Sequence, residues 1–503
     1  MADAPVLDFD DIQGNILAGF NKDHQTFLFV RLPEAQADAQ AWMAELVDQV
    51  ASHTEVVAFN DLYKRLRARR LQRIDGVLSV VWMNVAFTPS GLAKLGHAEP
   101  VGEKPDAFAQ GIAARAPALG HVGASAPETW LPCFRQAGLI DAVLAIAGDD
   151  PDDLCEAVLG YVDAIGNHGG SVALRLEGDA RVDEPGHEHF GFKDGVSQPG
   201  VRGVTPPNPN DPNQGDPGQD LLWPGEFVVG YPRQQRPAPP PGGGYPPQPQ
   251  PEVDINAPSD ITPATPDWTK NGSFLVFQRL EQAVSEFREF VAQHAPAVGL
   301  SEELLGAKLV GRHKSGCPLE VINGPGDIGQ TTADIGLTNA DVLDAAHIND
   351  FGYQTPDADG HNVPRGAHIR KAYPRDEEPP GELDVQTHRI MRRGVAFGTS
   401  YRQGAPVGSP AHAAQDRGLL FACYQTSLED QFEFIQSTWV NNPNFPQGND
   451  GVDAVLNETD GTTTTIPGAN PPAVPLQAFV KMTGGAYFFS PGISALRLLA
   501  GQT

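Results

Sequence analysis

The sequence predicts an α+β fold made of two ferredoxin-like domains with antiparallel sheets, arranged like a dimeric α/β barrel. Three observations support this prediction. The strand-like and helix-like segments of the first 200 residues follow the order βαββαβ, which is that of the split ferredoxin-like unit. A weaker version of the same pattern occurs in the second half. A stretch rich in proline and glycine separates the two, and 503 residues exceed the usual size of a single core.

The first unit is read from hydrophobic periodicity. Apolar residues at helical spacing, such as Trp42 and Leu46, predict a helix, and Pro151 stands where a helix favours proline, at its first position. Short apolar runs such as LSVVWMNVAF predict buried strands. The predicted strands are 26–32, 78–87, 140–147 and 171–177, and the predicted helices are 36–52 and 151–166.

The second unit shows the same kinds of signal less regularly. Apolar runs such as GSFLVFQRL and GLLFACYQT predict strands, and helix-forming stretches follow two of them. The predicted strands are 272–280, 394–398, 418–426 and 484–489, and the predicted helices are 281–295 and 428–439.

Domain boundaries follow from these elements. We expect an N-terminal domain over 1–200, a linker or insertion over 201–265 and a C-terminal domain over 266–503. The insertion contains PAPPPGGGYPPQPQP at 237–251, a composition that buries little surface and predicts an exposed loop. Residues 447–470, rich in Gly, Asn, Asp and Thr, predict a second, smaller surface insertion.

Composition excludes several classes of function. With 63 acidic and 35 basic side chains the net charge is −28, which disfavours nucleic-acid binding because that requires a basic surface. Four scattered cysteines form no C-x-x-C pair, so neither a zinc site nor a disulfide framework is expected. The first residues lack a signal-peptide pattern and no apolar run could span a bilayer, so we expect a cytoplasmic location and no membrane partner.

Three segments carry residues suited to chemistry. The first is GHEHFGFKDGVSQPG at 186–200, in which Gly191 and Gly195 flank Asp194. Glycine allows tight turns and close approach to a flat ligand, and a carboxylate held there can move protons. A G-x-x-D-G string alone is weak evidence, because many turns contain it.

The second segment is PRGAHIRKAYPRDE at 364–377, where His368 stands close to Arg370. A neutral imidazole beside cations suits a metal ligand near an anionic group such as a haem propionate. The chain has 14 histidines, and a lone histidine more often packs or lies at the surface, so spacing does not select this one.

The third segment is HRIMRRGVAFG at 388–398, where a cluster of cations runs into an apolar strand. A solvated basic face is the simple explanation. The apolar residues that follow nevertheless imply that one arginine points inward, where it needs an anion or a partner carboxylate.

Taken together, these strings resemble the dye-decolorizing peroxidase family. The resemblance covers nearly the whole chain and follows the family's order. It includes the three segments above together with DDIQGNILAGF (10–20), WPGEFVVGYP (223–232), NGSFLVFQRL (271–280), GLLFACYQTSLEDQFEFIQSTWVNNPNFP (418–446) and GGAYFFSPGISAL (484–496). Several such strings in order are far more specific than any one of them. The length and the opening string resemble the longer, cytosolic-type branch.

The resemblance implies one haem b per chain, bound in the second domain. His368 matches the proximal ligand of the haem iron, Asp194 the distal acid and Arg392 the distal arginine. Arg392 is preferred over its neighbours because it stands five residues before Phe397 of the Phe-Gly strand end. Further residues expected at the cofactor are Arg370, Gly191, Gly195, Leu419 and Phe421.

The activity implied by the resemblance is reduction of hydrogen peroxide and one-electron oxidation of aromatic donors such as dyes and phenols. Trp439 matches a surface-ward tryptophan that carries electrons in some members. The other nitrogen of His368 should bond a carboxylate or carbonyl, for which Glu429 and Asp430 are candidates. Two alternatives remain: a haem-handling or iron-releasing protein on the same fold, and a haem-binding protein without catalysis. The oligomeric state is not predicted.

Overall fold

The structure is a computed structural model of the whole chain. It describes residues 5–68, 79–236, 254, 256–320, 348–377, 379–380, 382–402, 416–446, 448, 450–469 and 472–502.

The first half confirms the predicted βαββαβ order. Each predicted strand and helix appears, and Asp150 caps the second helix by accepting from the N–H groups of Asp152 and Asp153. The predicted helix 36–52 is shorter than expected, and a further helix follows it, α3 (His53–Ala68). The elements are β1 (His24–Arg31), α2 (Gln36–Leu46), β2 (Val81–Phe87), β3 (Ala142–Gly148), α7 (Pro151–Asn167) and β4 (Ser171–Asp179).

The second half also contains the predicted strands. The predicted helix 428–439 is present, but it carries two π-helical turns, η8 (Leu428–Phe432) and η9 (Ile435–Val440). The other elements are β9 (Ser273–Gln282), α8 (Val284–His294), α9 (Glu302–Val310), α12 (His368–Ala372), α13 (Glu382–Gln386), β10 (Met391–Arg392), β11 (Val395–Gly398), β12 (Arg417–Gln425), β15 (Val480–Ser490) and α14 (Ile493–Leu499).

Both halves contribute to one sheet. Among the described residues its strand order is β10-β12-β9-β15-β2-β3-β1-β4, with β11 also paired to β12. The halves join where Phe489 of β15 pairs with Phe87 of β2. At the other end β11 lies against β4, so closely that a Cβ on Gly178 would come within 2.4 Å of Val395 Cγ1. The sheet therefore curls into a barrel, whereas the boundaries at 200 and 265 stay a prediction.

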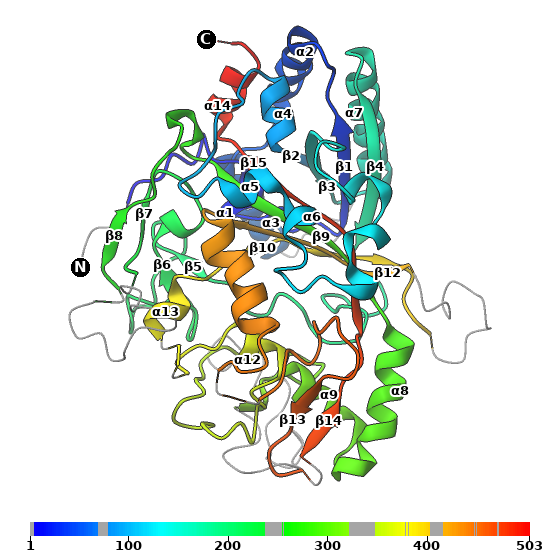
Figure 1. Cartoon of the computed structure of the whole chain (residues 1–503). Coiled ribbons are helices and arrows are strands. Elements are labelled where there is room, and N and C mark those ends of the chain that lie inside the picture. Colours follow the sequence, from blue (N-terminus) through cyan, green and yellow to red (C-terminus); the bar gives the residue numbers. More distant parts are fainter. Residues whose placement is uncertain are drawn as a thin grey trace.

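The barrel is packed with aromatic rings from both halves. Phe29 of β1 contacts Phe277 of β9 with ring centroids 5.0 Å apart, and Phe134 contacts both. Edge-on packing of this kind stabilises beyond the area it buries. Figure 1 shows α2, α4 (Pro89–Lys94), α7 and α14 towards one end of the molecule, and α8, α9 and α12 with the β13–β14 hairpin (Thr463–Thr465, Ala473–Pro475) towards the other.

The prediction that 201–265 is an exposed loop is wrong for residues 221–231. The stretch around β6 (Leu221–Leu222) and β7 (Pro232–Gln234) is buried in the core, and the apolar residues of WPGEFVVGY explain why. The tract 237–251 lies outside the described residues. The buried side chains include Leu221, Leu222, Trp223, Phe227, Val228, Val229 and Tyr231.

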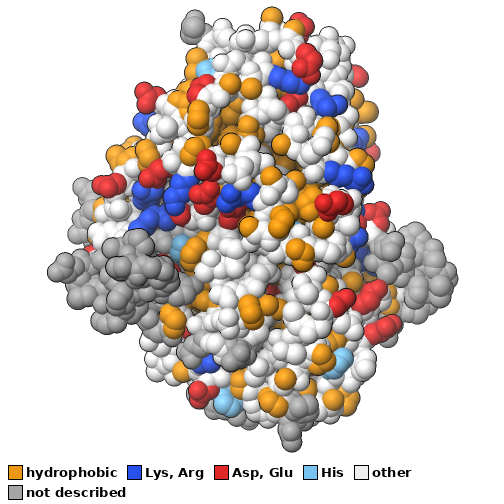
Figure 2. Space-filling view, in the orientation of Figure 1, with side chains coloured by type: hydrophobic (Ala, Val, Ile, Leu, Met, Phe, Trp, Pro, Cys, Tyr) orange, Lys and Arg blue, Asp and Glu red, His pale blue; other side chains and the backbone are white. Residues whose placement is uncertain are grey.

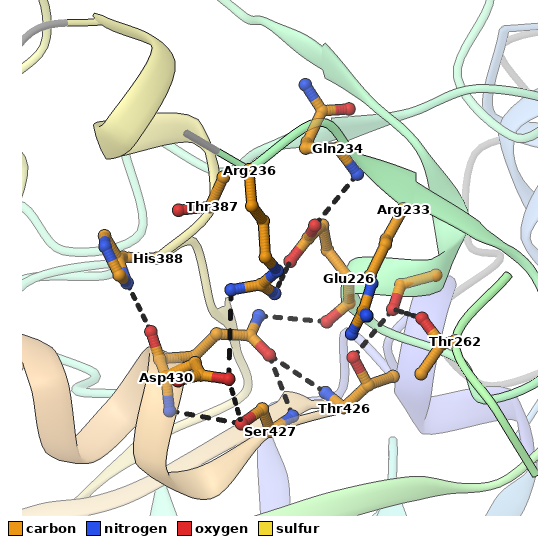
Figure 3. Close-up of polar contacts among 12 residues, drawn as sticks. Glu226, Arg233, Gln234, Arg236, Thr262, Thr387, His388, Thr426, Ser427 and Asp430 are labelled. Atoms are coloured by element: carbon orange, nitrogen blue, oxygen red, sulfur yellow. Dashed lines mark hydrogen bonds and ion pairs between the residues drawn. The ribbon is translucent and has the colours of Figure 1, made fainter. Parts of the chain in front are cut away.

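Polar contacts also fix this segment to the second half (Figure 3). Glu226, which is fully buried, accepts from the backbone N–H of Gln234 and pairs with Arg236 at 3.3 Å. Burial raises the pKa of Glu226, and the positive charge of Arg236 opposes that rise. Gln431 on η8 donates to the Glu226 carbonyl at 3.0 Å. The segment is therefore part of the folded unit.

The prediction of a second surface insertion over 447–470 is wrong for residues 452–457. Ala454 and Ile466 are buried, and Asp453 has no exposed surface. The short apolar run VDAVL inside this polar segment is the signal of its burial. In the described part of the chain no helix is long and apolar enough to cross a membrane.

Core membership of the 201–265 segment can be tested with two valines. Val228→Ala removes a side chain with 0% exposure, and we expect it to lower the free energy of unfolding by about 2 kcal/mol. Val182→Ala makes the same chemical change at 93% exposure and should lie within about 0.5 kcal/mol of the parent. Denaturant titration measures both. Equal effects of the two substitutions would contradict this assignment.

Candidate active site

His368 is held by a buried carboxylate. It is the first residue of α12, and its Nδ1 lies 2.9 Å from Oδ2 of Asp453. The other oxygen of Asp453 accepts two backbone N–H groups, from Val455 and Leu456, each at 2.8 Å. With one oxygen fixed by the backbone, the carboxylate directs the second at the imidazole. The His368 side chain itself remains 29% exposed.

Electrostatics favour an ionised aspartate at this pair. Burial raises the pKa of Asp453, but His368 and the two backbone N–H groups outweigh it, and the pKa ends below its usual value. Burial lowers the pKa of His368, and Asp453 reverses that effect, so that the pKa ends raised. An ionised Asp453 accepts a hydrogen bond from Nδ1, so Nε2 is the ring nitrogen that lies outside this pair.

The predicted carboxylate partners of His368 are wrong. Glu429 and Asp430 lie on η8 and face other cations: Glu429 is 3.7 Å from Arg115, and Asp430 pairs with Lys104. Asp453 lies 85 residues after His368, in a segment interpreted as a surface insertion.

Asp194 and Arg392 come together across the two halves. Oδ1 of Asp194 lies 3.7 Å from Nη1 of Arg392, with both side chains partly exposed. Arg392 also donates to the carbonyl of Ser197, and its backbone carbonyl accepts from Gln198 at 2.9 Å. Both charges act on the pKa of His368, Arg392 lowering it and Asp194 raising it. The three predicted residues therefore lie close enough for their charges to influence one another.

Two glycines shape the loop that holds Asp194. Gly191 and Gly195 have φ of +97° and +69°, which side chains rarely adopt. The N–H of Gly195 donates to Oδ1 of Asp194 at 2.6 Å. A Cβ on Gly195 would touch nothing within 4 Å, so glycine is needed at this position for its conformation rather than for space. Glu188 ties the preceding turn by accepting the N–H groups of Phe190 and Phe192.

Leu419 and Phe421 lie on one face of β12. They alternate with Leu420 and Ala422, which are buried in the core, while Leu419 and Phe421 are only half-buried. The next residue on their face, Cys423, pairs with Arg392 of β10. Leu419 and Phe421 therefore lie on the same face of β12 as Cys423, which is the partner of Arg392 in the sheet.

The three arginines of the RIMRR segment have different partners. Arg389 pairs with Asp220 at 3.1 Å, and its guanidinium lies over the ring of Tyr373. Arg393 points inward and donates to the carbonyls of Asn15, Ile16 and Leu17. Arg392 is thus the arginine that pairs with Asp194.

Arg370 does not join the group around His368. Its guanidinium has no exposed surface, binds both carboxylate oxygens of Glu377 and also pairs with Asp357 at 3.1 Å. Residues two apart on a helix point to opposite sides, which explains why α12 presents His368 and Arg370 in different directions. The structure therefore contradicts the predicted contact of Arg370 with a cofactor.

Trp439 is not at the surface as predicted, because its side chain is 1% exposed. It stacks on Phe445 with centroids 5.6 Å apart and meets Phe434 and His388 edge-on. His388 in turn stacks on Phe434 at 3.6 Å and bonds the carbonyl of Asp430. These rings form a buried aromatic cluster.

Comparisons with known proteins identify the family of this chain. The family model described as "DyP dimeric alpha+beta barrel domain" matches residues 11–182, and "Dyp-type peroxidase, C-terminal" matches 248–450. "Peroxidase 2" of Mycetinis scorodonius is 31% identical over 98% of this chain and 87% of its own. "Multifunctional dye peroxidase DyP2" of Amycolatopsis sp. is 30% identical over 97% of this chain and 95% of its own.

Solved structures are similar over nearly the whole chain. An ancestral D-type dye-decolorizing peroxidase has a TM-score of 0.76 and 32% identity, covering 98% of this chain and 99% of that one. A dye-decolorizing peroxidase in complex with 2,6-dimethoxyphenol has a TM-score of 0.76 and 28% identity, covering 98% and 100%. The chain therefore belongs to the Dyp-type peroxidase family, a family of haem-dependent enzymes.

Proposed function

We propose that His368 would hold the iron of one haem b per chain, and that Asp194 and Arg392 would activate hydrogen peroxide there. The enzyme is a peroxidase that uses hydrogen peroxide to oxidise organic donors. One observation carries the assignment of residues. His368 is oriented by a buried carboxylate, and it lies in the same part of the molecule as an aspartate–arginine pair contributed by both halves of the chain.

The residues present suit a haem. Nε2 of His368 makes no hydrogen bond within the described residues, and the partial exposure of the ring leaves it accessible. The half-buried Leu419 and Phe421 offer an apolar wall, as a porphyrin face requires. When bound, haem supplies the iron at which peroxide is reduced.

The protein's part in the chemistry is proton transfer and charge stabilisation. Oδ1 of Asp194 is held by the Gly195 N–H and faces Arg392, so Oδ2 is the oxygen that takes a proton from peroxide and returns it to the leaving hydroxide. Arg392 stabilises the negative charge that develops as the O–O bond breaks. Asp453 keeps the proton on Nδ1 of His368 and increases the basicity of the ligand.

We also propose that Trp439 carries electrons from bulky donors. Since it is buried, a dye cannot touch it, and electrons must reach it through its packed neighbours. Half-buried Phe434 and Tyr373 belong to the same cluster and are the candidates.

The iron-releasing alternative has weaker support. "Deferrochelatase" of Yersinia pestis is 26% identical over only 30% of this chain and 25% of its own length. The peroxidases, by contrast, match nearly the whole of this chain. Aromatic compounds such as phenols are the donors we propose. The cytoplasmic location and the absence of nucleic-acid partners stay predictions, the latter supported by the net charge of −28.

The ligand assignment predicts that His368→Ala loses most of its haem, since the variant offers the iron no imidazole at this position. The Soret absorbance per mole of purified protein and its iron content measure the loss. His388→Ala is the matched control, because its ring packs on Phe434, and this variant should keep its haem. A His368→Ala protein with parental haem content and activity would refute the assignment.

The role of Asp453 predicts a graded effect. Asp453→Asn keeps the size of the side chain but removes its charge, and we expect haem affinity or peroxidase activity to fall about 10- to 100-fold. Transfer of haem to an excess of apomyoglobin measures the affinity. Asp450→Asn, which alters a carboxylate paired with Arg365 at 3.4 Å, should keep parental affinity. Indistinguishable behaviour of the two variants would show that Asp453 does not tune the ligand.

The proton-transfer role predicts slow peroxide activation in Asp194→Asn. The second-order rate constant for reaction with hydrogen peroxide, measured by stopped-flow absorbance, should fall at least about tenfold. Haem content should not change. Asp216→Asn, at an exposed carboxylate of the 201–265 segment, controls for loss of surface charge. An unimpaired Asp194→Asn would leave Arg392 as the main distal group.

Electron transfer through Trp439 predicts a difference between donor classes. Trp439→Phe should lower turnover of a polycyclic dye several-fold more than turnover of a small phenol, because the small donor can approach the haem directly. Trp268→Phe changes a half-buried indole that bonds Glu99, and should affect neither class. Proportional losses for both donors in Trp439→Phe would indicate a packing defect instead.

A further inference from the structure

A cavity lies away from His368, Asp194 and Arg392. Its volume is about 360 Å³, and it lies between helices α5 (Asp106–Gln110) and α6 (Ile112–Arg115), the start of α4 and the middle of β15. Figure 2 shows hydrophobic side chains gathered around a hollow in the region of these helices. None of the three site residues lines it.

The lining of this cavity is apolar and aromatic. Phe108, Phe134 and Tyr487 form walls, and Ile112 and Ile140 fill the space between them. The described lining residues include no Asp, Glu, Lys, Arg or His. An ion entering the cavity would lose hydration without meeting an opposite charge, whereas a neutral aromatic ring would gain contacts.

The walls are fixed in place before any ligand arrives. The hydroxyl of Tyr487 donates to Glu433 at 2.9 Å, and Glu433 is held by Arg115 through two N–H groups. Tyr487 therefore presents its ring, and its hydroxyl is already engaged. Phe134 is held by Phe29 and Phe277 in the barrel. Rigid walls lower the entropy lost on binding.

Access to the cavity runs past polar, exposed residues. Gln110 and Gln136 belong to the lining and are exposed. The amide oxygen of Gln110 already accepts from Arg115 at 3.3 Å, so Gln136 is the amide that can accept a hydrogen bond from an N–H or O–H of a ligand. Ala486, in the middle of β15, is half-buried although its strand lies within the sheet. Its side chain also lines the cavity, which accounts for that exposure.

We propose that this cavity is a binding site for a neutral, planar aromatic molecule of one or two rings. The volume lies at the lower end of the range for small-molecule sites, about 300–1,000 Å³, which suits one such ligand. The uncharged lining excludes anionic and cationic relatives of the same molecule. The site does not depend on haem or on the residues assigned to peroxide.

The alkylation rate of Cys133 measures whether a ligand occupies the cavity, because Cys133 belongs to its lining. Cys155 is exposed, so Cys155→Ser supplies the background in which Cys133 is the accessible thiol, Cys317 and Cys423 being buried. Burial raises the pKa of the Cys133 thiol to about 11, so alkylation by iodoacetamide is followed at about pH 8.5–9, where some thiolate is present. Mass spectrometry of the peptide containing residue 133 gives the rate in the purified full-length protein.

Saturating indole should slow alkylation of Cys133 at least fivefold, and indole-2-carboxylate at the same concentration should leave the rate unchanged. Ala486→Leu and Ala113→Leu, one on the sheet and one on α6, each fill the cavity and should abolish the effect of indole. Ala173→Leu makes the same change on β4, outside the cavity, and should preserve it. No protection by indole, equal protection by both compounds, or protection that survives both filling substitutions would overturn the proposal.

Discussion

The proposed site depends on the hydrogen bond between Asp453 and His368. A carboxylate with no exposed surface is costly to bury unless its oxygens are bonded, and Asp453 meets this need with two backbone N–H groups and one imidazole. Its own N–H donates to Val440 at the end of η9. One residue thus joins the 450–469 segment, the π-helical turns and α12, and it fixes which nitrogen of His368 faces the site.

The closed sheet supplies the second constraint. Asp194 belongs to the loop that follows the first βαββαβ unit, whereas His368 and Arg392 belong to the second half. Asp194 and Arg392 meet because β11 lies against β4 and β10 pairs with β12. This arrangement brings Arg392 to the loop after β4. Neither half alone contains both the acid and the arginine. In the proposed mechanism the barrel therefore has a role in the chemistry as well as in stability.

Amino-acid composition predicted exposure wrongly where a short apolar run lies inside a polar segment. The 201–265 and 447–470 segments are rich in residues typical of loops, yet WPGEFVVGY and VDAVL within them are buried. Arg370 and Trp439 show a related difficulty. Motif similarity predicted that Arg370 lies near the cofactor, but helix geometry turns it towards Glu377. The same similarity predicted that Trp439 lies near the surface, but neighbouring aromatic rings enclose it.

The sequence alone determined the order of strands and helices, because hydrophobic periodicity and capping residues are local properties. Its resemblance to a known family also singled out His368, Asp194 and Arg392 as candidate site residues, and the structure places Asp194 within 3.7 Å of Arg392. Only the tertiary structure decided that Asp453 bonds His368, that Arg393 bonds the carbonyls of Asn15 and Leu17, and that the two units share one sheet. Each of these contacts joins segments far apart in the chain, and which donor meets which acceptor depends on how the whole sheet closes.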